Sequence, residues 1–192
     1  MARFRLRSRS EVVERCQALR TDVSVALARL PTHEPAVVDA VWRGEALGTL
    51  LWSLHLVELP PYDRPFDTDE VVEANAAAGE LRDPDELELE RDTARLWHWR
   101  ARTTDLQQSG TLQLPSRYSS FDQLIAATAM RGHDEGLLPV PIRGDFRAYG
   151  KVYRHLTPEQ HAEAHSIAAE RHHALNWLAG EGASWNDVPL DT

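Results

Sequence analysis

Apolar residues recur every three or four positions over most of this chain. Such spacing is typical of amphipathic helices that bury one face. Residues that start and stop helices bound these stretches, as in the Ser8–Glu11 capping box and the terminating Pro31. The pattern predicts an all-α, single-domain bundle (1–192) of about five to six helices. The expected helices span roughly 8–30, 34–57, 68–78, 84–108, 120–131 and 157–179.

Three segments depart from the helical pattern. Residues 138–153 are β-like and predict at most a small hairpin, because Pro139 and Pro141 exclude a central position in a sheet. Residues 1–8 are rich in arginine and predict a basic arm that is either flexible or docked at an edge. Residues 180–192 predict an extended C-terminal tail, which we expect Trp185 to pin to the body.

Two charged residues stand where apolar ones are expected. Glu45 lies on the apolar surface of the second predicted helix, on the same side as Trp42, and Arg171 lies in the middle of the apolar stripe of the last helix. A charge at such a position is paired in the interior or lines a cavity. The apolar residues within roughly 60° of Arg171 around the helix axis are Ala164, Ile167, Ala168, Ala174, Leu175 and Leu178.

An ion pair between Glu45 and Arg171 resolves both anomalies, because an unpaired interior charge costs several kcal/mol. Arg100 is the rival partner for Glu45. The cluster is either structural, fixing the register of the helices, or it lines a ligand cavity; with a different helix phase, Arg171 would instead reach solvent on its long stem. The candidate ligand-binding residues are Glu45, Arg171, Asn176, Trp42 and Arg100.

The two functional hypotheses differ in what this cluster does. In the first, the protein is a module that binds a protein partner or a small ligand, without a cofactor, and its acidic surface favours a basic partner. In the second, it is an enzyme acting on a small anionic substrate: Arg171 or Arg100 binds the anion, His172 is the acid–base residue and Asn176 orients the substrate. The enzyme hypothesis requires a cavity of about 300 Å³ or more beside Arg171. No nucleophile, phosphate-loop or dinucleotide motif supports it.

Three histidines follow one stripe of the last helix, His161, His165 and His172. The first two have a legitimate metal-ligand spacing of i and i+4. His172 lies about 10.5 Å further along the axis, whereas two nitrogens on one ion are only about 3–4 Å apart. The three therefore cannot share one metal. Because no His-Glu-x-x-His or Cys-x-x-Cys motif completes a set, we expect no metal site, with His161 and His165 as the candidates should one exist.

The composition of the chain limits the classes of partner and the cellular locations that we expect. The formal net charge of −9 argues against general nucleic-acid binding and against anionic membrane surfaces. The longest apolar run, around Leu50–Trp52, is too short to span a bilayer, and no apolar segment of signal-peptide length follows the basic start. The single cysteine, Cys16, falls in a core stripe and fits a reducing compartment. We therefore expect a cytoplasmic protein.

Several elements together resemble a known family. They are Trp-Arg-Gly-Glu-Ala-Leu (42–47), Leu-Trp-His-Trp-Arg (96–100), Glu-Arg-His-His-Ala-Leu-Asn-Trp-Leu (170–178) and Trp-Asn-Asp-Val-Pro (185–189). The combination, which covers nearly the whole chain, is similar to the bacterial family called domain of unknown function 4272. The resemblance implies a mostly helical bacterial protein of unassigned activity, and it supplies no catalytic residues.

Overall fold

The computed structural model describes residues 5–111 and 113–191 and confirms the all-α prediction. The chain is 61% helical, with six α-helices and one small antiparallel hairpin among the described residues. The α-helices are α1 (Arg9–Leu27), α2 (Pro35–Ser53), α3 (Thr68–Glu73), α4 (Pro84–Gln108), α5 (Phe121–Asp134) and α6 (Pro158–Leu178). The hairpin joins β1 (Arg147–Ala148) to β2 (Lys151–Val152), and short 3₁₀ turns cover Ala76–Ala78, Tyr153–His155 and Trp185–Asp187.

The predicted caps start the helices as expected. Ser8 and Glu11 form a reciprocal capping box on α1, and Thr157 and Gln160 form another on α6. The predicted end of the second helix is wrong. It ends at Ser53 instead of near residue 57, because His55 adopts φ 59° and the freed carbonyls of residues 53 and 54 accept hydrogen bonds from the backbone of residues 82 and 80. Likewise the helix expected over 68–78 divides into α3 and a 3₁₀ turn.

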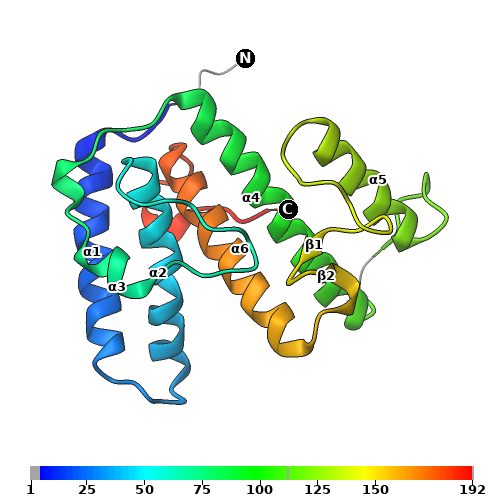
Figure 1. Ribbon diagram of the computed structural model, residues 1–192, viewed down its shortest axis with the longest axis horizontal. Coiled ribbons are helices and arrows are strands. Elements are labelled where there is room, and N and C mark those ends of the chain that lie inside the picture. The colour runs from blue at the N-terminus through cyan, green and yellow to red at the C-terminus, as the bar shows by residue number, and fades with distance from the viewer. Residues whose placement is uncertain (1–4, 112, 192) are drawn as a thin grey trace.

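Helix α2 is the centre of the fold. It packs against α1 on one side and against α6 on the other, and α6 in turn packs along α4 (Figure 1). A run of α2 side chains, from Ala46 to Leu51, is completely buried, which is typical of a central helix that is apolar on all sides. The close approach at Gly48 lets the Phe66 ring lie directly on the helix backbone.

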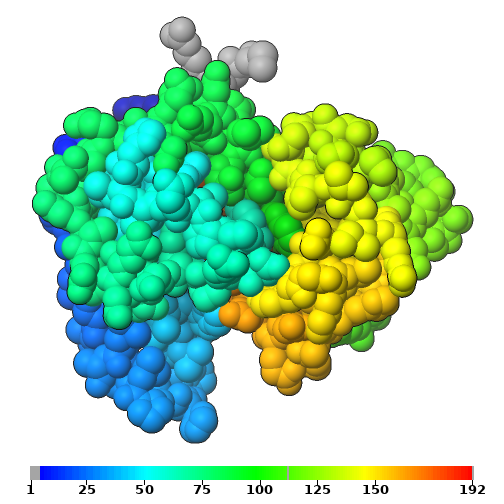
Figure 2. Space-filling model, viewed as in Figure 1, coloured from blue at the N-terminus to red at the C-terminus, as the bar shows by residue number. Residues whose placement is uncertain are grey.

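The second half of the chain packs around α4. Trp97 is buried and stacks on Tyr62 with ring centroids 5.4 Å apart, whereas Trp99 is half-buried on another side of the helix. Helix α4 is therefore packed on two sides. Figure 2 shows the segment from α2 to α3 covering the left half of one face and the segment from α5 to the hairpin covering the right half.

Both ends of the described chain are docked. The predicted basic arm lies partly outside the described residues, at positions 1–4, but Arg7 donates hydrogen bonds from its backbone to Leu178 and from its side chain to Gly182. In the tail, Trp185 packs on His173 and Trp177 at centroid distances of 4.4 and 5.5 Å, which confirms the predicted anchor. Within the described ranges, none of the helices is both long enough and apolar enough to cross a membrane.

Candidate functional site

The predicted ion pair between Glu45 and Arg171 is confirmed. Arg171 in α6 is fully buried, and its Nε and Nη2 both lie 2.9 Å from Oε2 of Glu45 in α2. The other carboxylate oxygen, Oε1, accepts a hydrogen bond of 2.8 Å from the backbone of Phe66. Burial raises the pKa of Glu45, and the neighbouring Arg171 opposes that rise.

The loop over residues 60–66 accepts the remaining hydrogen bonds of the Arg171 guanidinium. Nη1 of Arg171 donates to the carbonyl of Pro60 at 2.6 Å, and Nη2 donates to the carbonyl of Arg64 at 2.9 Å. The rings of Tyr62 and Phe66 each lie 4.9 Å from Cζ. Every nitrogen of Arg171 therefore has a protein acceptor, and the group has nothing left to offer a substrate.

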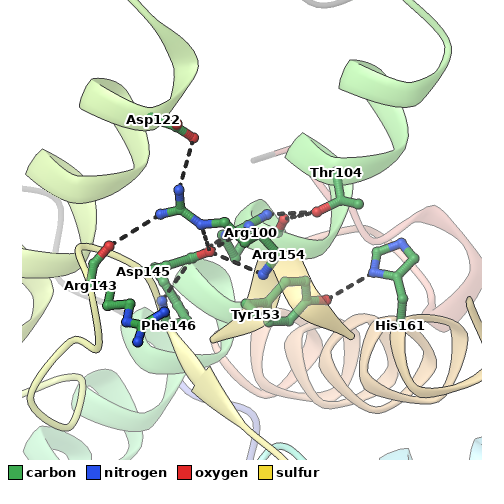
Figure 3. Close-up of polar contacts among 9 residues, drawn as sticks. All are labelled: Arg100, Thr104, Asp122, Arg143, Asp145, Phe146, Tyr153, Arg154 and His161. Atoms are coloured by element: carbon green, nitrogen blue, oxygen red, sulfur yellow. Dashed lines mark hydrogen bonds and ion pairs between the residues drawn. The ribbon is translucent and has the colours of Figure 1, made fainter. Parts of the chain in front are cut away.

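Arg100 is not the partner of Glu45, so that rival prediction is wrong. It pairs with Asp145, in the turn before β1, through a bidentate contact of 2.7 and 2.9 Å (Figure 3). Asp145 also accepts hydrogen bonds from the backbone of Phe146 and Arg154. Burial works to raise the pKa of Asp145, but these donors, led by Arg100, hold it below its usual value. Both partners are almost completely buried.

His172 and Asn176 form a separate buried chain. Arg91 can only donate, so its 2.7 Å contact identifies Oδ1 of Asn176 as the acceptor. The amide nitrogen of Asn176 then donates to Nε2 of His172 at 3.1 Å. Nδ1 of His172 therefore carries the proton and donates to Nδ1 of His98 at 3.0 Å. Both ring nitrogens of His172 are occupied, which leaves none for proton transfer to a substrate.

The candidate residues thus do not meet in one cavity. Glu45 and Arg171, Arg100, and the His172–Asn176 pair belong to three separate clusters, and Trp42 is a half-buried residue packed on the core. Three surface cavities of about 550, 540 and 470 Å³ lie among the described residues. None of these three is lined by any of the candidate residues.

The 540 Å³ cavity adjoins the other side of the Arg171 helix, and we call it the Arg15 pocket. Arg15 from α1, Arg43 from α2, Glu170 and His173 from α6, and Trp185 from the tail line it. With Asp22 of α1, which also lines it, two cations, two carboxylates and an imidazole thus converge on one hollow from four segments. Convergent polar groups in a concave site of this size are typical of small-ligand binding.

Arg15 is the unusual residue in this pocket. Its guanidinium carbon lies 5.0 Å from the ring centre of Trp185 and 5.6 Å from that of Trp177. Its Nε is buried, yet no acceptor for it exists among the described residues. A buried donor without an acceptor is uncommon and requires an explanation. The guanidinium is therefore held in place by indole rings and makes no hydrogen bond to another described residue, so its terminal nitrogens, unlike the buried Nε, are left for a ligand.

Arg43 and Glu170 complete the electrostatics of the pocket. Among the described residues, the ion-pair partner of Arg43 is Asp22 at a long 3.5 Å, and both side chains are about half exposed. Burial raises the pKa of Glu170 to about 7; Arg43 opposes this shift, and Asp39 and Glu45 add to it. Glu170 thus changes charge near neutral pH beside two cations.

His161 and His165 lie elsewhere, half-buried on the side of α6 that faces α4. The structure brings Asp105 of α4 to both of them, with nitrogen–oxygen distances of 2.7 and 3.0 Å. Spacing along α6 alone did not reveal this third residue, because it comes from a different helix. His172 is not part of this group.

Sequence reasoning missed the Arg15 pocket. Glu170 and His173 flank the singled-out Arg171, and Arg43 stands two positions before Glu45, so the signal was present in the same motifs. It was overlooked because these side chains fall outside the apolar stripe.

Comparisons with protein-family models, curated proteins and solved structures found no match. The resemblance to domain of unknown function 4272 therefore stays a prediction.

Proposed function

We propose that this protein is a binding module for a small anionic ligand, which it takes up in the Arg15 pocket. The observation that carries the proposal is the guanidinium of Arg15, which is fixed by Trp177 and Trp185 but makes no hydrogen bond or ion pair with another described residue. Arginine is suited to this task because its planar donors match the geometry of carboxylate, sulfate and phosphate groups.

Electrostatics supports an anion at this position. The chain carries a formal net charge of −9, so most of its surface repels anions. In the pocket, Arg15 and Arg43 offset the charges of Asp22 and Glu170, and protonation of Glu170 below its pKa of about 7 leaves the four side chains with a net positive charge. The exposed contact of Arg43 with Asp22 is weak enough for a ligand to replace.

The shape of the site favours a small ligand over a protein partner. A volume of about 540 Å³ lies within the range of pockets that enclose small molecules. The Trp185 ring offers an apolar wall for the part of the ligand beyond its anionic group. The single cysteine, which is buried, supports a cytoplasmic location as part of the same proposal.

An enzyme acting on the bound anion is the second candidate. The observation that favours it is Glu170, whose pKa of about 7 suits a general acid or base and which lines the same pocket as both arginines. In this candidate function, Glu170 takes the acid–base role instead of His172, because both ring nitrogens of His172 are already hydrogen-bonded. Turnover that is lost in Glu170→Gln while ligand affinity is retained would distinguish the enzyme from the binding module.

Sulfate is the probe for the anion subsite, because it has one charge state across neutral pH. We expect calorimetric titration to give saturable binding of one sulfate per chain, accompanied by a change in tryptophan fluorescence. Arg43→Gln and Arg15→Gln should each weaken binding by about tenfold or more, the effect of losing a charge-assisted hydrogen bond.

Arg29→Gln is the matched control. Arg29 is an exposed arginine that is also paired with a single carboxylate, Glu34, outside the pocket. It should leave the affinity for sulfate unchanged. Sulfate binding that survives both Arg15→Gln and Arg43→Gln, or an absence of saturable binding, would contradict the proposal.

A further inference from the structure

We propose that Asp105, His161 and His165 form a binding site for a divalent metal ion, with zinc as the best match. His161 and His165 stand one helical turn apart on α6, and Asp105 projects from the last part of α4. Two imidazoles and one carboxylate are a ligand set that zinc commonly takes in proteins. This site is independent of the Arg15 pocket.

The carboxylate of Asp105 already binds both imidazoles. Its Oδ1 accepts a hydrogen bond from Nε2 of His161 at 2.7 Å, and its Oδ2 lies 3.0 Å from Nδ1 of His165. The carboxylate thus brings the two imidazoles to opposite oxygens of one side chain, within reach of a common ion. The packing of α4 against α6 places them there, because these two helices run along each other in the core.

The separations are close to those of a coordinated ion. One ligand atom from each residue lies within 4.8 Å of the other two. Zinc binds nitrogen and oxygen at about 2.0–2.2 Å, so two ligand atoms of one ion are at most about 4 Å apart, and a closure of about 1 Å suffices. The Asp105 and His165 side chains are 43% and 34% exposed, so they have room to make this movement.

A second layer of contacts orients His161. Its Nδ1 lies 3.2 Å from the hydroxyl of Tyr153, whose ring is covered by the guanidinium of Arg100 at 4.5 Å (Figure 3). Asp145 in turn holds Arg100. Metal-binding histidines commonly engage their second nitrogen in this way, which fixes the direction of the first. Metal binding would change the tautomer of His161. The ring proton leaves Nε2, which becomes free to coordinate, and Nδ1 becomes protonated and donates a hydrogen bond to the Tyr153 oxygen.

The carboxylate of the sequence motif is directed away from the proposed ion. Glu163, the carboxylate between the two histidines, lies near Tyr149, whose pKa it raises together with burial, instead of beside the three ligands. The general base of a His-Glu-x-x-His hydrolase thus has no counterpart in this motif. A bound ion would join α4 to α6 and leave its fourth position to water, since His161 and His165 are partly exposed.

The experiment uses the full chain after chelator treatment. We expect zinc titration by calorimetry to give one ion per chain, and cobalt(II) to produce visible absorption bands of a low-coordinate site that zinc then abolishes. His161→Gln, His165→Gln and Asp105→Asn should each weaken zinc binding at least tenfold. Zinc should raise the melting temperature of the parent protein and leave that of Asp105→Asn unchanged.

His155→Gln is the control, because His155 is an exposed histidine six residues before His161 and outside the group. It should bind zinc like the parent. Asparagine has the same size as aspartate, and position 105 is partly exposed, so Asp105→Asn should not disturb the fold. This variant therefore keeps the test valid if a histidine variant loses stability. Absence of stoichiometric binding, or binding that persists in Asp105→Asn and both histidine variants, would overturn the proposal.

Discussion

Arg100 and Arg171 are the two largest fully buried side chains among the described residues. Each is held by one carboxylate from a distant part of the chain, Asp145 and Glu45 respectively, and by further backbone or hydroxyl acceptors. A buried ion pair gains little over apolar packing, but removing one partner leaves the other charge in the interior. At this scale the arginines are structural residues whose loss is costly.

Arg171→Met should destabilise the protein by about 3–5 kcal/mol, because it leaves Glu45 buried with a single backbone donor, that of Phe66. Urea denaturation monitored by circular dichroism measures the free energy of unfolding. Arg29→Met removes an exposed pair and should cost less than about 1 kcal/mol. Equal losses in the two variants would mean that the Arg171 charge is not held in the interior.

His172 should make the fold sensitive to acid. Burial, together with the positive charges of His98, Arg91, Arg95 and His173, lowers its pKa to about 3. An unfolded chain has a histidine pKa of about 6.5. As pH falls below 6.5 the unfolded state therefore takes up a proton that the folded state does not, so stability is lost toward pH 3. Between pH 7 and pH 5 this loss amounts to about 2 kcal/mol from this residue.

The measurement is the free energy of unfolding at both pH values. His172→Gln should show a correspondingly smaller loss between them, whereas the exposed His33→Gln should lose as much stability as the parent. A pH dependence that is identical in His172→Gln and the parent would contradict a neutral, buried His172.

Helices form where local signals and apolar spacing agree. The starts of α1 and α6 were predictable because capping boxes act within four residues. The end of α2 was not, because it depends on backbone groups of residues 80 and 82 that approach from a different segment. The 60–66 loop was equally unpredictable, since its carbonyls are committed to an arginine more than a hundred residues away.

Two glycines of α2 allow the effect of helix propensity on stability to be measured apart from the effect of packing. Gly48 touches Phe66, so a methyl group in Gly48→Ala would collide with that ring, which adjoins the backbone donor to Glu45. We expect a cost of about 1–3 kcal/mol from overpacking. At Gly44 nothing lies within 4 Å of the added carbon, so Gly44→Ala should stabilise the helix by about 0.5–1 kcal/mol.

Thermal melting of both variants checks this prediction. The opposite signs are the essential result, because the two substitutions are chemically identical and lie one turn apart on the same helix. If Gly48→Ala were as stable as Gly44→Ala, the close packing of the 60–66 loop on α2 would be wrong.

The whole molecule brings together groups that the sequence keeps apart. The helical class and the Glu45–Arg171 pair followed from periodicity, because a charge within an apolar stripe requires a partner. The Arg15 pocket did not, since α1, α2, α6 and the tail each contribute only one or two polar residues to it. Each of these looks like an ordinary surface residue until the tail, anchored by Trp185, closes over α6.

Sulfate binding should weaken as pH rises from 6 to 8. Burial and nearby carboxylates raise the pKa of Glu170 to about 7, so the pocket acquires a negative charge across this interval. A charge roughly 6 Å from a dianion costs about a tenfold loss of affinity in a well-hydrated site. Calorimetric titrations at pH 6 and pH 8 measure the effect, and Glu170→Gln should bind sulfate with similar affinity at both. A parent protein that binds more tightly at pH 8 would contradict this assignment.

The most direct test of the central claim is an NMR titration of ¹⁵N-labelled protein with sulfate. Our account predicts that the Nε–H of Arg15 and the indole N–H of Trp185 shift with saturation. The signals of the Arg171 Nε–H and of the backbone amides of residues 62–64 and 66 should not shift. Shifts that concentrate at Arg171 and this loop, with Arg15 unaffected, would show that the buried ion pair is the binding site and that our account is wrong.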